Sequence, residues 1–179
     1  MKICIFSVAP WMQTGYGRNA AMIAHALRKH DVAIAAMYGV RGGPITYQLP
    51  FTPTSQVEVF GLRGEIGAGM EQHLAHLSQN FDLIIQHFDC WPLTPGWAAT
   101  MQCPVYTYSP IDNLPIPKKI IDSHIGVELA ISMSHFAEDA YMRAGIRTHY
   151  IPHAVNPLLR RLDKISSKVA LGIPIDGIS

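Results

Sequence analysis

The chain has 179 residues, of which 49% are hydrophobic and 15% are charged, and its formal net charge is +1. This length suits one domain with a sizeable core, and the low charged fraction suits a buried sheet covered on both faces. The near-zero net charge gives no electrostatic basis for binding nucleic acid or an anionic membrane, so we expect neither partner.

Strand-like and helix-like segments alternate along the chain. Short apolar runs predict strands over residues 2–8, 32–38, 57–60, 82–88, 105–108, 127–131 and 149–151. Helical spacing of apolar residues predicts helices over residues 17–29, 70–77, 97–101, 118–123 and 136–143. The proline-containing stretch 45–56 is expected to be a loop or a sheet edge.

This alternation is typical of βαβ units. Because such crossovers are right-handed, we predict an α/β fold: a doubly wound, mostly parallel Rossmann-like sheet with helices on both faces. The domain is expected to cover residues 1–157. Residues 158–179 are interpreted as a helix or linker toward a second domain that this chain does not contain.

The cysteines and the N-terminus both favour a cytoplasmic protein. Cys4, Cys90 and Cys103 are odd in number and lack C-x-x-C spacing, so we interpret them as reduced residues. Residues 1–8 lack the longer apolar region and the cleavage site of a signal peptide. No stretch approaches the 18 or more apolar residues of a membrane span.

A glycine-rich loop, T-G-Y-G-R-N-A at residues 14–20, separates the first predicted strand from the first helix. It matches the dinucleotide pattern G-x-G-x-x-A, but residues 11–14 lengthen the turn and the second strand ends without an acidic residue. The same physics suits another phosphate, because glycines allow close approach and a helix N-terminus offers N–H groups. We therefore predict that Gly15, Gly17 and Arg18 bind phosphate. The alternative is a simple turn with a surface arginine.

Polar and aromatic residues follow four successive strands. The carboxyl ends of parallel strands share one edge of a sheet, so these side chains are expected to line one cleft. The residues concerned are Asp89, Trp91, Asp112, Ser132, Ser134 and His153.

Each of these residues also has a structural interpretation. Asp112 follows a proline and could form an Asx turn, while Ser132 and Ser134 could cap the next helix. Trp91 and His153 could be packing residues. His87 lies within its strand and is predicted to be a buried core histidine.

Several motifs resemble group 1 (family 4) glycosyltransferases of the GT-B type. Residues 130–136, 144–146 and 150–156 resemble the signature that closes the N-terminal domain of that family. The segment S-P-I-D-N at 109–113 resembles a P-[VI]-D-G element of one branch, which also carries an aspartate and a nearby tryptophan after the fourth strand. Better-known members have a histidine where this chain has Ser109, and P-H-A-V-N at 152–156 departs from the P-H-G-V-D of the family.

The resemblance implies the N-terminal, acceptor-side domain of a retaining glycosyltransferase that works without a metal. A nucleotide-sugar would be the co-substrate, no cofactor is implied, and the partner would be the C-terminal GT-B domain of the same protein. We expect no membrane association from this half. By resemblance, the donor diphosphate would contact Gly15, Gly17 and Arg18, the catalytic residue would be Asp112, and the acceptor would contact Asp89, Trp91, Ser132, Ser134 and His153.

Two other classes stay open. One is a non-catalytic Rossmann-like binding module, and the other is a dinucleotide-dependent oxidoreductase domain. The long glycine loop and the missing acidic residue count against the second.

Overall fold

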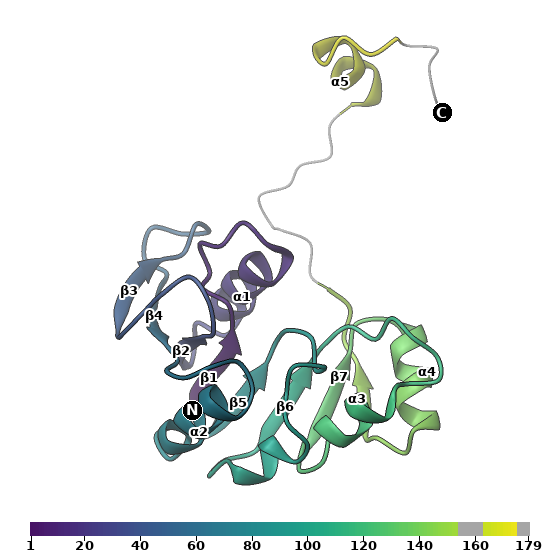
Figure 1. Ribbon diagram of the computed structural model, residues 1–179. Coiled ribbons are helices and arrows are strands. Elements are labelled where there is room, and N and C mark those ends of the chain that lie inside the picture. The colour runs from purple at the N-terminus through teal and green to yellow at the C-terminus, as the bar shows by residue number, and fades with distance from the viewer. Residues whose placement is uncertain (154–162, 175–179) are drawn as a thin grey trace.

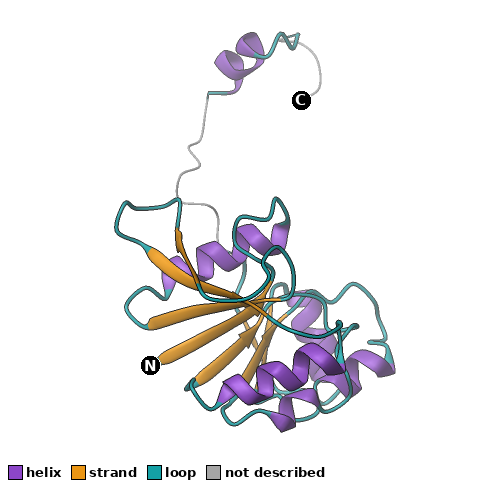
Figure 2. Cartoon of the chain, turned by 60° about the vertical axis from the view of Figure 1, so that its left-hand side comes forward, coloured by secondary structure: helices purple, strands orange, loops and turns teal. Residues whose placement is uncertain are grey.

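One eight-stranded sheet organises the chain (Figures 1 and 2). The structure is a computed structural model that describes residues 1–153 and 163–174. In chain order the elements are β1 (Lys2–Ser7), α1 (Gly15–Ala26), β2 (Asp31–Ala36), β3 (Ile45–Gln48), β4 (Gln56–Gly61), α2 (Ala68–Ser78), β5 (Leu83–Gln86), the 3-10 helix η1 (Trp97–Thr100), β6 (Val105–Tyr108), α3 (Lys118–Ser123), β7 (Leu129–Ser132), α4 (His135–Arg143), β8 (Thr148–Tyr150) and α5 (Lys164–Ala170).

The strand order is β3-β4-β2-β1-β5-β6-β7-β8, and every neighbouring pair is parallel except the antiparallel pair of β3 and β4. The chain winds outward from β1 to β2 in one direction and from β5 to β8 in the other. The order of the strands therefore reverses between β1 and β5. In open α/β sheets this switch point, at the carboxyl ends of the strands, is where ligands bind.

Alternate strand residues point to opposite faces of the sheet, and each face has its own helices. On one face, Ile5 and Ile34 pack with the small residues of α1, which let the helix lie close to the sheet. On the other face, Phe6 and Ile84 pack with Leu74 of α2 and with η1. Helices α3 and α4 contribute to the same core cluster as β7. The structure confirms the predicted doubly wound, mostly parallel sheet with helices on both faces (Figure 2).

Two expected elements differ in detail. Helix α1 begins at Gly15, two residues before the predicted start, because the Thr14 hydroxyl accepts the Gly17 N–H at 3.1 Å and caps an earlier turn. The stretch 45–56 contains β3, an exposed edge strand antiparallel to β4.

No residue of α5 is buried. The predicted boundary between domain and linker, at residues 157 and 158, lies outside the described residues. Within the described ranges, no helix has the length and apolar character needed to cross a membrane.

Candidate functional site

The start of α1 and the loop after β5 meet at the switch point of the sheet. The hydroxyl of Tyr16, in the first turn of α1, donates a 2.8 Å hydrogen bond to Oδ1 of Asp89. Burial, this hydrogen bond, and the charges of Asp89 and Asp112 all raise the pKa of Tyr16. Tyr16 therefore stays a protonated donor at neutral pH, and both predicted carboxylates lie near it.

The two glycines of the loop differ in the space that a side chain would have. A Cβ on Gly17 would lie 2.4 Å from the carbonyl oxygen of Met12 and 3.0 Å from that of Ala9, whereas a Cβ on Gly15 would meet nothing within 4 Å. Gly17 is thus required by the close approach of its own loop. Its N–H is already bonded to Thr14, and the Arg18 N–H bonds the Thr14 carbonyl.

The N–H groups before Gly17 in the first turn of α1 have no intrahelical partner, as at any helix start. They belong to Gly15, which is exposed, and Tyr16. Arg18 is also exposed. The phosphate prediction for Gly15, Gly17 and Arg18 stays a prediction, and the geometry favours the open side at Gly15 over the enclosed side at Gly17.

A pocket of about 450 Å³ opens beside the Tyr16–Asp89 pair. The ends of β1, β2 and β5 give it an apolar floor, and two exposed aromatic residues, Trp91 and Tyr38, line it together with Lys119. The remaining lining residues are Val8, Met37, Ile66, Phe88 and Pro92. The structure therefore brings Asp89 and Trp91 into one pocket.

The loop that carries Trp91 is fixed by a buried carboxylate of α2. Glu71 accepts the Thr94 backbone N–H at 2.8 Å and also the Thr94 hydroxyl. Sequence reasoning missed both Glu71 and Tyr16. Two weak signals could have identified them. Glu71 is an acidic residue within a helix predicted from apolar spacing, and Tyr16 lies between the two glycines of the loop.

A row of aromatic rings separates this pocket from a second one. His87 lies edge-on to Tyr16, with ring centroids 5.5 Å apart, and stacks on Tyr108 at 5.2 Å. His87 is fully buried, as predicted, and burial lowers its pKa to about 4. Its Nδ1–H donates to the Tyr108 carbonyl at 2.8 Å, which leaves Nε2 as an acceptor without a partner among the described residues.

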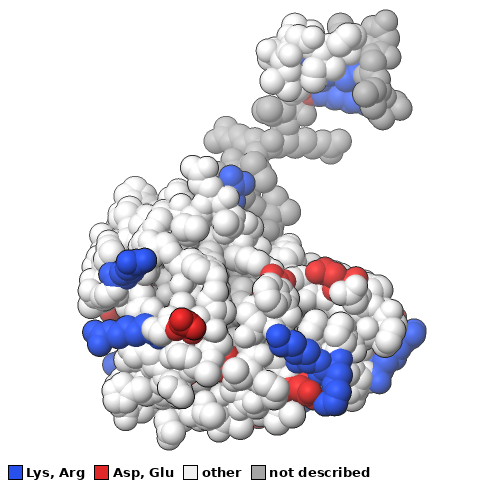
Figure 3. All heavy atoms as spheres, viewed as in Figure 1, with Lys and Arg blue, Asp and Glu red and all other residues white. Residues whose placement is uncertain are grey.

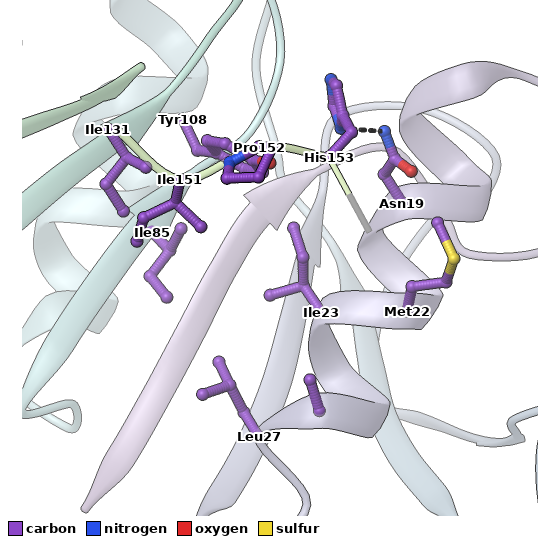
Figure 4. A pocket seen from close by; sticks show the side chains of 11 residues that line it. Asn19, Met22, Ile23, Leu27, Ile85, Tyr108, Ile131, Ile151, Pro152 and His153 are labelled. Carbon is purple, nitrogen blue, oxygen red and sulfur yellow. Dashed lines mark hydrogen bonds between the residues drawn. The ribbon is translucent and has the colours of Figure 1, made fainter. Parts of the chain in front are cut away.

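His153 lies on the far side of this row, away from Asp89. Its Nδ1 is 3.1 Å from the Asn19 amide nitrogen, at the mouth of an apolar pocket of about 270 Å³ (Figure 4). Ile23 of α1 and Leu27, the residue after the helix, form one wall of that pocket, and residues of β5 and β7 contribute to the other. The structure thus places His153 in a different pocket from Asp89 and Trp91. The neighbouring motif residues 154–156 lie outside the described residues.

The two predicted serines do not open toward the first pocket. Ser134 is the N-cap of α4, its hydroxyl accepting the Ala137 N–H at 3.1 Å, which is the structural interpretation of that residue. Ser132 is fully buried, and its hydroxyl has no hydrogen-bond partner among the described residues. Neither is in hydrogen-bond contact with Asp89 or Asp112 in that part of the chain.

Ser109 is buried in a polar network. Its Oγ lies 2.8 Å from the Gln86 side-chain oxygen and 2.6 Å from the Phe88 carbonyl, and the Cys90 thiol lies 3.1 Å from it. Burial raises the pKa of Cys90 to about 12, so this thiol is not an activated nucleophile. The network holds the end of β5 against β6 and thereby fixes the start of the Asp89 loop.

Charged residues are sparse and mixed in sign on the face shown in Figure 3. Within the described ranges, no group of three side chains could hold a metal ion. The site offers carboxylates, a tyrosine hydroxyl, aromatic rings and helix N–H groups. Such a set can bind hydroxyl groups and a phosphate and can accept a proton.

No protein-family model matches the chain, and no curated protein matches it. Among solved structures, the chain is similar to a sucrose-phosphate synthase from Thermosynechococcus elongatus, with 13% sequence identity and a TM-score of 0.49. The alignment covers 87% of this chain and 91% of that one. A similarity of this size carries no conclusion about function, and the fold assignment rests on the strand order described above.

Proposed function

We propose that this chain is the acceptor-side domain of a GT-B glycosyltransferase, which transfers a sugar from a nucleotide-sugar to a hydroxyl group without a metal. The observation that carries the proposal is the Tyr16–Asp89 hydrogen bond with Asp112 nearby. The hydrogen bond joins a glycine-containing helix start to the Asp89 carboxylate at the switch point of the sheet.

In this proposal the donor diphosphate lies over the first turn of α1. The N–H groups of Gly15 and Tyr16 would bind it, the helix dipole would favour its negative charge, and Arg18 would add a charge-assisted hydrogen bond. A C-terminal domain of the same protein would close the cleft and hold the rest of the donor. Without that domain, we expect this chain to bind donor weakly and not to transfer sugar.

The acceptor would enter the pocket beside Asp89 and Trp91. Asp112 is exposed, and its charge acts on Tyr16, the partner of Asp89; in this proposal its carboxylate orients or deprotonates an acceptor hydroxyl. From the resemblance to family 4 glycosyltransferases we further propose that the configuration at the anomeric carbon is retained. The dinucleotide alternative has less support, because residues 8–14 form a long loop between β1 and α1 and β2 ends in alanine.

The test is a transfer assay on the chain extended by its C-terminal domain, with a panel of nucleotide-sugars and hydroxyl acceptors. We expect transfer that Asp112→Asn lowers strongly. Asp139→Asn, an exposed aspartate of α4, is the matched control and should leave transfer unchanged. Absence of transfer and of nucleotide-sugar binding in the extended protein, together with saturable binding of NAD, would refute the proposal in favour of the dinucleotide alternative.

A further inference from the structure

The pocket beside Asp89 also carries information about the chemistry of the acceptor. That the ligand of this pocket is an acceptor rests on the proposed function, but its binding can be measured separately. The pocket has about 450 Å³, within the usual range of roughly 300–1,000 Å³ for small-molecule sites. It is large enough for a ring-sized ligand.

Two large aromatic side chains of the pocket stay in solvent. Trp91 is 58% exposed and Tyr38 is 46% exposed, although the sheet below them is well packed. Both residues lie on anchored loops: the Glu71 carboxylate accepts the N–H of Thr94, three residues after Trp91, and the Tyr38 carbonyl accepts the Ala9 N–H at 2.9 Å. Exposed aromatic residues in a pocket provide flat apolar surfaces for a ligand.

The charged groups around the pocket are of both signs, so they do not strongly select an ion of one sign. Asp89 lines it and Asp112 lies near Tyr16, so an anion would be repelled. Lys119 also lines the pocket, and its ammonium group offsets part of the attraction of these carboxylates for a cation. A purely apolar ligand would bury the Asp89 carboxylate without replacing its water, which is unfavourable.

The Asp89 carboxylate has acceptor capacity to spare. Its Oδ1 accepts the Tyr16 hydroxyl, and within the described part of the chain its Oδ2 accepts no hydrogen bond. Because Tyr16 stays protonated, it keeps the carboxylate oriented. A ligand that places O–H donors beside an apolar ring face would satisfy both the carboxylate and the aromatic surfaces.

From these observations we infer that the pocket binds a neutral sugar or polyol ring, which is the acceptor of the proposed transfer. A face of its C–H groups lies against Trp91, with Tyr38 contributing a second apolar surface. Its hydroxyl groups donate to Asp89. The acceptor is thus a carbohydrate or a carbohydrate-bearing molecule.

The chain itself allows a direct test by tryptophan fluorescence. Trp97 is 1% exposed, so its emission is insulated from solvent, while Trp91 is the most exposed tryptophan in the described chain. Glucose, galactose, mannose, maltose and cellobiose are titrated into the 179-residue protein, with choline as the cationic probe, citrate as the anionic probe and cyclohexanol as the apolar one. Affinities of variants are measured by calorimetry, which does not depend on the tryptophan signal.

We expect a saturable emission shift with at least one neutral sugar and none with citrate. Trp91→Ala and Asp89→Asn should each weaken sugar binding by about tenfold or more, while Trp91→Phe keeps part of it. Phe136→Ala, which removes a similarly exposed aromatic ring from α4, is the control and should bind like the wild type.

Three results would overturn the inference: no saturable sugar binding by the folded chain, tighter binding of choline or cyclohexanol than of any sugar, or sugar binding unaffected by Trp91→Ala. This failure is distinguishable from failure of the proposed function. Sugar binding without transfer by the extended protein would leave a carbohydrate-binding module, and transfer to a non-sugar acceptor would refute the acceptor class alone.

Discussion

The two glycines of the loop before α1 allow turn geometry to be separated from ligand binding. In Gly17→Ala, the new Cβ would lie 2.4 Å from the Met12 carbonyl oxygen and 3.0 Å from that of Ala9. Both are backbone atoms, so the loop has to shift, at a typical overpacking cost of about 1–3 kcal/mol. The 2.4 Å approach places this cost in the upper part of that range, at about 2–3 kcal/mol, and alanine recovers about 1 kcal/mol of helix propensity, so we expect a net loss of about 1–2 kcal/mol in the free energy of unfolding.

Gly15→Ala is the matched partner. A Cβ there meets nothing within 4 Å, so we expect a change in unfolding free energy between about zero and a gain of about 1 kcal/mol. Urea titration of both variants measures the difference directly. Equal stability of Gly17→Ala and the wild type would refute the steric argument for Gly17.

The functional readout follows from the stability result. Because Gly15→Ala leaves the fold intact, a weaker affinity for UDP- or GDP-sugars in that variant would locate the phosphate over the first turn of α1. Unchanged donor affinity would reduce the loop to a turn. A bulky residue at position 17 cannot make this distinction, since it damages the loop whether or not a phosphate binds.

Three further predictions concern Asp112, Tyr16 and His87. In the extended protein, Asp112→Asn should lower kcat by about 100-fold or more while its Tm is unchanged, and a normal kcat with a lower Tm would instead assign Asp112 to structure. Tyr16→Phe keeps the ring beside His87 but removes the donor to Asp89, so calorimetry should show about tenfold weaker acceptor binding with little loss of stability; unaltered binding would disconnect the hydroxyl from the site. The pKa of His87 is about 4 when folded and about 6.5 when unfolded, so the unfolded state takes the proton first and stability is lost as pH falls from about 6.5 to about 4, by up to roughly 3 kcal/mol. Urea titrations at several pH values should show a shallower acid slope in His87→Gln than in the wild type, and equal slopes would assign the effect to other groups.

Local patterns predict the sheet but only part of the site. Apolar runs of four to eight residues are enough to locate buried parallel strands, because burial on both faces leaves little room for polar residues. Asp89 and Asp112 follow the neighbouring parallel strands β5 and β6, as predicted, and Asp89 bonds the Tyr16 hydroxyl there. The bounds of a helix depend on its caps. Because Thr14 caps α1, the helix begins two residues before the start predicted from sequence.

The contacts that shape the site join residues far apart in the sequence. Tyr16 and Asp89 are separated by 73 positions, and Glu71 and Thr94 by 23, so spacing gives no signal for either pair. In sequence, Ser134 fits a helix cap and a ligand contact equally well, and its bond to the Ala137 N–H confirms the cap while ligand contact stays a prediction. His153 follows a strand end like Asp89, but the aromatic row around His87 places it in another pocket.

The Glu71–Thr94 contact has a consequence for the thermodynamics of binding. A loop that must become ordered when its ligand arrives loses conformational entropy at that moment and binds more weakly. Here the buried carboxylate of α2 already fixes the loop, so Trp91 is presented to solvent on a rigid support. The free protein carries the ordering cost in advance as part of its folding, and the ligand meets a preorganised surface.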